Sequence, residues 1–458
     1  MQAILRFIFG KRVESDMTEG NILRHLVRFA LPLLLGNVFQ QLYNLVDAWV
    51  VGNFVSNEAF SAVGTVGPII NLLIGFFMGL SSGAGVVISQ FFGAKKEKEV
   101  HDTVHTALML TLLLGVVFTA VGLLITPWML QLMKTPAEVL PESTRYLSIY
   151  FWGVSGLMLY NIGAAILRAV GNSRLPFLFL VVSTLLNIGL DLLFVLGFDM
   201  GVEGVALATV LAQAVSAVLV LLTLIRLSSS VRIRIRELRI HWGMLKKIIR
   251  VGIPAALQMS VTAFSNVFVQ SYINFFGADC MSGWTAYAKI DQLLFLPMQS
   301  IALASTTFVG QNLGLMQVDR AKQGVRTAVA VALVSTVALA IPVIAFAPSL
   351  VRIFNDKPEV VDYGTQFLRW ITPFYVLSCF NQIYAGALRG SGNTRAPMLI
   401  MLGSFVLFRQ IYLFVVTRYV ANTVFLVAMG YPMGWLLCSL LTVLYYRKTS
   451  LTLHRVVE

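Results

Sequence analysis

Long apolar runs separated by short polar segments fill most of this chain. Each run is near or above the ~20 residues that a helix needs to cross a bilayer, and no strand-like alternation interrupts them. The runs lie at roughly 26–55, 59–92, 104–133, 146–168, 175–198, 203–225, 247–276, 282–310, 325–350, 363–388, 396–417 and 422–446. The pattern predicts an all-α polytopic membrane protein with twelve transmembrane helices.

The amino-acid composition is typical of a protein embedded in a lipid bilayer. Hydrophobic residues make up 57%, charged residues only 12%, and the mean hydropathy is +0.80. A soluble domain with a solvated surface does not carry this balance, which argues against a soluble multidomain enzyme. The net charge of +13 comes largely from cytoplasmic segments. No motif indicates nucleic acid as a partner.

The two halves of the chain repeat each other. Residues 165–176 read AILRAVGNSRLP and residues 386–397 read GALRGSGNTRAP, while Asn44 in the first half matches Asn266 in the second. The offset is 222 residues at the asparagines and 221 at the repeated phrase, so the repeat spans most of each half. Six spans per half predict two six-helix bundles, an N-lobe and a C-lobe, related by a pseudo-two-fold axis along the membrane normal.

Basic residues set the expected orientation. Most of the 34 Lys and Arg fall at the two ends and in every second loop, which is the positive-inside pattern. We therefore expect a multi-pass monomer in the plasma or inner membrane with both termini cytoplasmic. The basic segment between the two halves, residues 226–246, could also bind anionic lipid headgroups. The predicted parts are a lead (1–25), the N-lobe (26–225), the linker (226–246), the C-lobe (247–446) and a tail (447–458).

Few ionisable residues lie inside the predicted spans. A charged side chain at the bilayer centre costs about 2.5–3.5 kcal/mol on insertion scales, so each one is a functional candidate by default. These residues are Asp47, Asp191, Lys289, Asp291 and Arg409.

Polar residues of three N-lobe spans could converge in the outer half of the bilayer. Gln40, Asn44 and Asp47 follow each other at i, i+4 and i+7, which places them on one helix face. Such carboxylate, amide and hydroxyl oxygens could hold Na⁺, or repulsion between two acids could keep a proton on one of them. The alternative is a structural role, in which these residues form hydrogen bonds between helices and stabilise their packing. The candidate coupling set is Asp47, Asp191, Asn187, Thr209 and Gln40.

Two further features are less specific. A possible C-lobe polar site contains Lys289, Asp291 and Arg409. The first two could balance each other's charge, and Arg409 could bind an anionic group, act as a counter-charge or pack against backbone carbonyls. Pro32 removes a backbone hydrogen bond in the first span, so we expect a kink there, either static or acting as a conformational hinge.

No residue pattern indicates an enzyme. Cys280, Cys379 and Cys438 are isolated, the five histidines fall in or near cytoplasmic segments, and no Walker A phosphate loop is present. His101 and His105 have i, i+4 spacing, and we expect them to form a solvated helix face and not a metal site. The chain should be a secondary transporter that uses no cofactor.

The order of motifs resembles the multidrug and toxic compound extrusion (MATE) family across nearly the whole chain. These motifs are the Pro-Gln-Asn-Asp first span, Gln-x-x-Gly at the ends of spans two and eight, the repeated Leu-Arg-x-x-Gly-Asn-x-Arg-x-Pro and Gly-Val-Glu-Gly-Val-Ala-Leu-Ala-Thr. The chain looks most like the DinF-like branch, which implies that Asp47, Asn187, Asp191 and Thr209 couple transport to a cation, with Gln40 nearby. The NorM-like branch also has acids in spans seven and ten, where this chain has Asn266 and Gln382.

The family resemblance implies export of amphipathic, often cationic drugs or toxic compounds in exchange for H⁺ or Na⁺. A path lined by aromatic and Met side chains and a few carboxylates would suit such compounds through cation–π contacts and charge attraction. The alternative is a lipid-linked oligosaccharide flippase of the same wider superfamily, which should carry several cationic residues in its cavity. The balance of buried acids favours cation-coupled export. The predicted cavity lining is Asn44, Tyr43, Phe39, Met158, Tyr160 and Phe264.

Overall fold

The computed structural model describes residues 14–55, 57–133, 135–227 and 229–457. Inside the helices it describes the backbone but not the side chains of 44, 45, 47–49, 52, 53, 57–61, 68, 261–264 and 267. The described backbone contains helices and loops and no strand. The all-α fold class is therefore confirmed.

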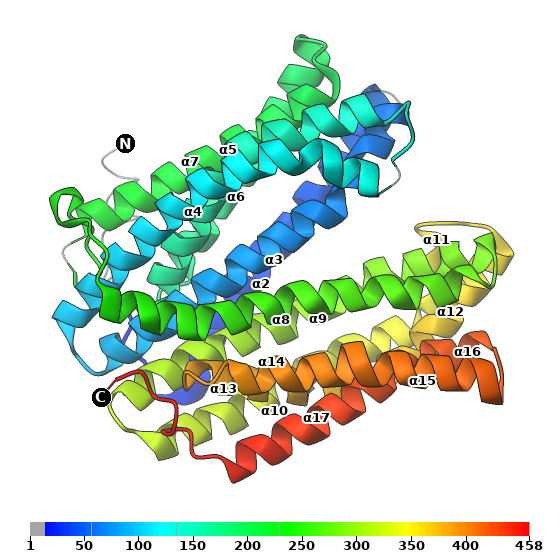
Figure 1. Cartoon of the computed structure of the whole chain (residues 1–458). Coiled ribbons are helices and arrows are strands. Elements are labelled where there is room, and N and C mark those ends of the chain that lie inside the picture. The colour runs from blue at the N-terminus through cyan, green and yellow to red at the C-terminus, as the bar shows by residue number, and fades with distance from the viewer. Residues whose placement is uncertain (1–13, 56, 134, 228, 458) are drawn as a thin grey trace. The chain divides into compact units, whose positions relative to one another are not determined.

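The first half contains six long helices in chain order (Figure 1). The fifth ends in a π-helical turn, η1 (Leu193–Gly197). The six helices are α2 (Ile22–Phe54), α3 (Asn57–Gly93), α4 (Glu97–Leu132), α5 (Leu140–Ala169), α6 (Arg174–Leu192) and α7 (Gly201–Arg226).

The second half follows the same order but is more often interrupted. Its continuous helices are α8 (Trp242–Asn274), α9 (Ala278–Gly314) and α10 (Val318–Ala345), followed by the short α11 (Ala347–Arg352). The next span is broken by a 3₁₀ turn into α12 (Pro358–Ile371), η3 (Thr372–Phe374) and α13 (Tyr375–Gly390). The last two spans consist of α14 (Arg395–Met401), η4 (Leu402–Phe408), α15 (Arg409–Val415), η5 (Val416–Val420), α16 (Val424–Ala428) and α17 (Gly430–Lys448).

Ten helices in the described part of the chain are long and apolar enough to cross a bilayer. The other two predicted spans correspond to α8 and to the broken helix α12–α13, which gives the twelve expected from the sequence. Large apolar side chains such as Leu124 (80%) and Trp152 (70%) are highly exposed, as expected for surfaces that lipid covers. The protein is a multi-pass membrane protein.

The chain forms two compact units, and two of the boundaries between them lie beside a proline within a helix. One unit contains Pro32–Gly252, and the other contains Met17–Leu31 together with the chain from Ile253 onward. Helix α2 therefore passes from one unit to the other at Pro32, and α8 does so one residue before Pro254.

Glycines allow the closest helix pair of the first unit. Helix α5 runs along α7 (Figure 1), and Gly153 and Gly163 of α5 face Val210 and Val220 of α7. A Cβ atom at these glycines would lie 2.3 Å and 2.7 Å from the valine side chains. Small residues at such positions let two helix backbones approach each other, and here they hold α7 in place beside α6.

The basic linker covers the start of α4. The buried His105 accepts a hydrogen bond at Nε2 from the backbone N–H of Arg234 (3.1 Å), and the N–H of His241 donates to Oγ1 of Thr106 (3.0 Å). The expectation of a solvated face is therefore wrong for His105, because the linker replaces water there. The spacing of hydrophobic and polar residues could not predict this contact, since the linker and the start of α4 are far apart in sequence.

Candidate functional site

Two helices of the first unit bring together three of the predicted coupling residues. Asn187 and Asp191 lie one turn apart on α6, and Thr209 lies on the neighbouring α7. With its amide nitrogen facing Asp191, Asn187 donates to Oδ2 of Asp191 (3.1 Å) and accepts from the backbone N–H of Thr209 (3.2 Å). All three side chains are buried, and Asp191 is fully so.

Helix α2 contributes Tyr43 to the same cluster. The Tyr43 hydroxyl lies 3.1 Å from Oγ1 of Thr209, and that oxygen donates its own proton to the carbonyl of Val205 (3.0 Å). Tyr43 must therefore be the donor to Thr209. The sequence placed Tyr43 in a drug-binding lining, but the structure makes it part of the polar cluster.

Two predicted residues of α2 fall outside the described side chains. Asn44 and Asp47 belong to α2 by their backbone, and their side chains lie outside the described residues. Asp47 follows Tyr43 by four residues, and residues four apart share a helix face. The prediction that Asp47 belongs to the cluster remains a prediction. Gln40 is exposed and makes no hydrogen bond to the cluster among the described residues.

The cluster places a buried carboxylate near the hydroxyl oxygens of Thr209 and Tyr43, while the amide oxygen of Asn187 already accepts from the Thr209 backbone. Hard cations prefer such ligands, and a buried carboxylate is also a place where a proton can be held. Among the described residues, no group of three or more His, Cys, Asp and Glu side chains could hold a metal ion. A buried carboxylate beside hydroxyl oxygens is chemically able to bind a monovalent cation or a proton.

The described side chains of the predicted cavity lining make different contacts. Phe39 packs edge-on against Phe177 with ring centroids 6.0 Å apart, and the Tyr160 hydroxyl donates to the carbonyl of Pro176 (3.0 Å). The side chain of Phe264 lies outside the described residues. These contacts join neighbouring helices, so packing explains Phe39 and Tyr160 as well as ligand binding does.

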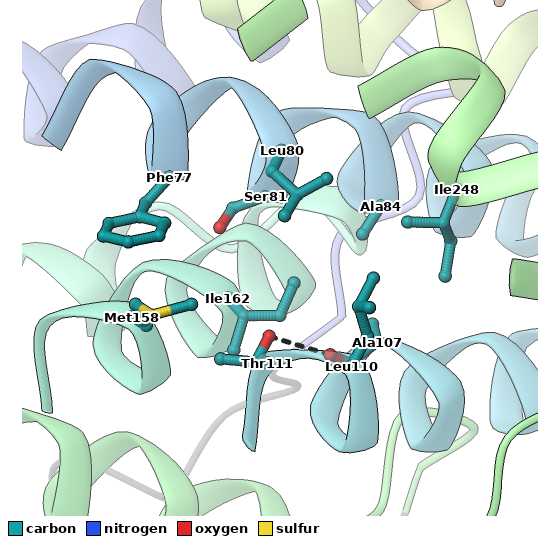
Figure 2. Close-up of a pocket in the computed structure, with 10 residues that line it drawn as sticks. All are labelled: Phe77, Leu80, Ser81, Ala84, Ala107, Leu110, Thr111, Met158, Ile162 and Ile248. Atoms are coloured by element: carbon teal, nitrogen blue, oxygen red, sulfur yellow. Dashed lines mark hydrogen bonds between the residues drawn. The ribbon is translucent and has the colours of Figure 1, made fainter. Parts of the chain in front are cut away.

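Of the predicted lining residues whose side chains the structure describes, only Met158 lines a pocket of the first unit (Figure 2). Helices α3, α4 and α5 supply most of the walls, which are apolar apart from two hydroxyls. The Thr111 hydroxyl donates to the carbonyl of Ala107 (2.8 Å), as Figure 2 shows, which leaves Ser81 as the other polar group. The described residues of its lining include no acid and are mostly apolar, which suits an apolar group.

In the second unit, Asp291 of α9 is held by two tyrosines. It accepts hydrogen bonds from the hydroxyls of Tyr287 (3.1 Å) and Tyr375. Lys289 is exposed, and no ion pair joins it to Asp291 among the described residues. The structure thus does not support charge compensation between the two. The spacing Tyr287-x-x-x-Asp291 signalled one of these partners, but Tyr375 lies 84 residues away.

Aromatic rings surround this carboxylate. Trp284 packs against Tyr287 and Tyr431 with ring centroids 4.8 Å and 5.5 Å away, and Trp435 packs against Tyr375 at 5.3 Å. Composition alone could not predict the cluster, because its members come from α9, α13 and α17.

Arg409 begins α15 at the edge of these rings. Its guanidinium donates to Oγ of Ser265 (2.5 Å) and Oδ1 of Asn266 (3.0 Å) on α8, and its Cζ lies 4.6 Å from the centre of the Tyr431 ring. Of the three readings open from the sequence, packing against backbone carbonyls is not observed among the described residues. The partners are neutral side chains and an aromatic face.

Comparison with known proteins places this fold among membrane transporters. The family model MatE matches residues 32–193 and again 254–415, so the same family unit occurs twice in the chain. The probable multidrug resistance proteins YpnP and YoeA of Bacillus subtilis are 29% and 30% identical, over 94% and 95% of this chain and 96% of each relative. The solved structure of a multidrug resistance MATE family transporter of the MOP superfamily, in an outward-facing conformation, has a TM-score of 0.89 at 23% identity, covering 95% of this chain and 98% of that one.

Proposed function

This chain belongs to the MATE family, and we propose that it is a secondary active multidrug efflux transporter that exports amphipathic, often cationic compounds in exchange for H⁺ or Na⁺. The relatives named above carry multidrug resistance in their names, which supports the substrate class. The observation that carries the coupling part of the proposal is the buried cluster of Asp191, Asn187, Thr209 and Tyr43.

The coupling ion would be held by oxygen atoms of this cluster. Asp191 would supply the charge, Thr209 a hydroxyl oxygen, and Asn187 would fix the carboxylate through its amide N–H. Asp47 would supply a second carboxylate one turn beyond Tyr43. A buried acid is unstable as a lone anion, so uptake of one cation or proton neutralises the site and release restores its charge.

Tyr43 links the occupancy of the site to the position of α2. Its hydroxyl donates to Thr209, so a change in the position of Thr209 acts directly on α2. Pro32 lies eleven residues earlier on α2, where the chain passes between the two compact units, and lacks a backbone N–H. We propose Pro32 as the hinge at which α2 bends when the ion binds.

Transport would follow from two packings of the lobes that differ in affinity for ion and drug. A ligand shifts such an equilibrium only as far as its affinities for the two states differ, so the ion favours one packing and the drug the other. Entry of the cation would then accompany release of the drug outside. The location that fits this cycle is the plasma or inner membrane with both termini cytoplasmic, and the branch is the DinF-like one.

The test is dye efflux from vesicles that contain the purified protein, with a Na⁺ gradient and a pH gradient imposed one at a time. Wild type should export a cationic dye under one of the gradients, and Asp47→Asn should reduce efflux to the level of empty vesicles. Asp199→Asn is the matched control, because Asp199 is exposed in a loop and its φ of 54° is one that Asn adopts readily. Normal efflux by Asp47→Asn, or no efflux by wild type under either gradient, would contradict the proposal.

A further inference from the structure

Arg409 is a buried cation that faces only neutral groups. The side chain is 2% exposed, and its hydrogen-bond partners are Ser265 and Asn266. Among the residues that the structure describes, it forms no ion pair and its Nε has no hydrogen-bond partner. The undescribed side chains of α8 beside these partners, at 261–264 and 267, are Val, Thr, Ala, Phe and Val and add no acid.

A buried charge without a counter-ion is destabilising, and an ionisable side chain inside a membrane-spanning helix is a functional candidate by default. Asp291 does not supply the counter-charge, because its carboxylate accepts from Tyr287 and Tyr375 and makes no ion pair with Arg409 in the described set. The free Nε–H of Arg409 is the donor that a bidentate carboxylate contact uses.

The repeat gives this position a counterpart in the first half. The two family matches are offset by 222 residues at their starts and at their ends. Pro176 and Pro397 are offset by 221, and the π-helical turn Leu402–Phe408 follows Pro397, where a π-bulge adds one residue to a helix. The extra residue restores the offset of 222, so Arg409 corresponds to Asn187.

The acids of the first half are absent from the second at this offset. Leu413 takes the position of Asp191, and Val269 takes that of Asp47. Leu413 and Val269 are both fully buried. The same place in the fold therefore carries carboxylates in the N-lobe and a single guanidinium in the C-lobe, so its charge is inverted.

We propose that Arg409 is the anchor for an anionic group, a carboxylate on an aromatic compound, among the compounds that this transporter carries. The inference rests on the proposed export function and names a substrate class within it: aromatic acids and zwitterions beside the cationic compounds. The carboxylate takes the free Nε–H and shares the terminal nitrogen that now donates to Asn266, while the aromatic body lies on Tyr431. Asn266 is exposed and Tyr431 half-buried, so the guanidinium is reached past these two side chains.

The test uses a rhodamine dye that carries a free carboxylate and the methyl ester of the same dye. Binding of each to the purified full-length protein is measured by fluorescence anisotropy. Asn266→Asp is the sharpest variant, because it is nearly isosteric and places a counter-ion where Oδ1 of Asn266 already accepts from Arg409. Arg409→Gln removes the charge itself, and Arg418→Gln, an exposed arginine in the following π-helical turn, is the matched control.

Wild type should bind both dyes. Asn266→Asp and Arg409→Gln should weaken binding of the acid relative to the ester by about tenfold to a hundredfold, the range of a charge-assisted hydrogen bond, and Arg418→Gln should not. An equal loss for both dyes, or no loss, would overturn the inference and leave Arg409 a structural residue. Binding of the ester without the acid by wild type would overturn the inference alone, whereas binding of neither dye would contradict the proposed function as well.

Discussion

In the N-lobe, Asn187 and Asp191 of α6 lie against Thr209 of α7, whereas in the C-lobe Arg409 of α15 lies against Ser265 and Asn266 of α8. The two places correspond in the repeat. In the N-lobe an amide N–H donates to a buried acid, and in the C-lobe two side-chain oxygen atoms accept from a buried base. Duplication supplied two copies of the same helical frame, and substitution at a few positions gave them opposite charge.

The difference indicates which lobe would bind the coupling cation and which would recognise a negative group of the transported compound. A site that binds a cation reversibly needs an acid that can lose its counter-ion, which the N-lobe has in Asp191. At the corresponding place the C-lobe has the guanidinium of Arg409, which stays protonated. On the proposals made above, this place would bind a negative group and would not bind and release the coupling cation.

The largest effect in the C-lobe should come from the tyrosine-held carboxylate. Asp291→Asn replaces a charged acceptor of two hydroxyl donors by a neutral one. We expect a loss of stability of about 1–3 kcal/mol, seen as a lower melting temperature of the purified protein, while the gradient dependence of efflux is retained. Lys289→Gln is the control, because Lys289 is exposed. If efflux by Asp291→Asn no longer depends on the gradient, a coupling acid lies in the C-lobe, and the proposed difference between the two lobes is wrong.

A smaller effect should follow from removing one hydroxyl of the N-lobe cluster. Tyr43→Phe deletes the donor to Thr209 but keeps the ring, so the ion site stays intact and its link to α2 is weakened. We expect gradient-driven dye efflux to fall by about twofold to tenfold, the range of a single neutral hydrogen bond. Tyr160→Phe is the matched control in the same lobe, since its hydroxyl donates to a backbone carbonyl. Equal effects of both variants would mean that Tyr43 serves packing only.

Sequence reasoning went furthest where two residues share one helix. Asn187 and Asp191 are four residues apart, a spacing that predicts a shared helix face, and the structure joins them by a hydrogen bond. Contacts between spans were not accessible in this way, because counting residues fixes the depth of a side chain but not the rotation of its helix. For this reason Tyr43 was assigned to drug contact and the partners of Arg409 were left open.

In the C-lobe, too, contacts between helices could not be predicted from residue spacing. The pairing of Lys289 with Asp291 was suggested by proximity in sequence, but residues two apart on a helix point in different directions. The tyrosine partners of Asp291 come from its own helix and from α13, and a distant partner cannot be read from one sequence. The fold class was easier, since the length of each apolar run is set by the thickness of the bilayer.

The central claim is that the coupling ion binds in the N-lobe and not at the equivalent place in the C-lobe. The most direct measurement is the melting temperature of purified wild type, Asp191→Asn and Arg409→Gln, with Na⁺ or choline as the salt cation and at several pH values. An ion that binds only the folded protein raises its melting temperature. The account predicts that the ion-dependent rise is lost in Asp191→Asn and kept in Arg409→Gln. A rise that persists in Asp191→Asn, or one that disappears in Arg409→Gln, would contradict it.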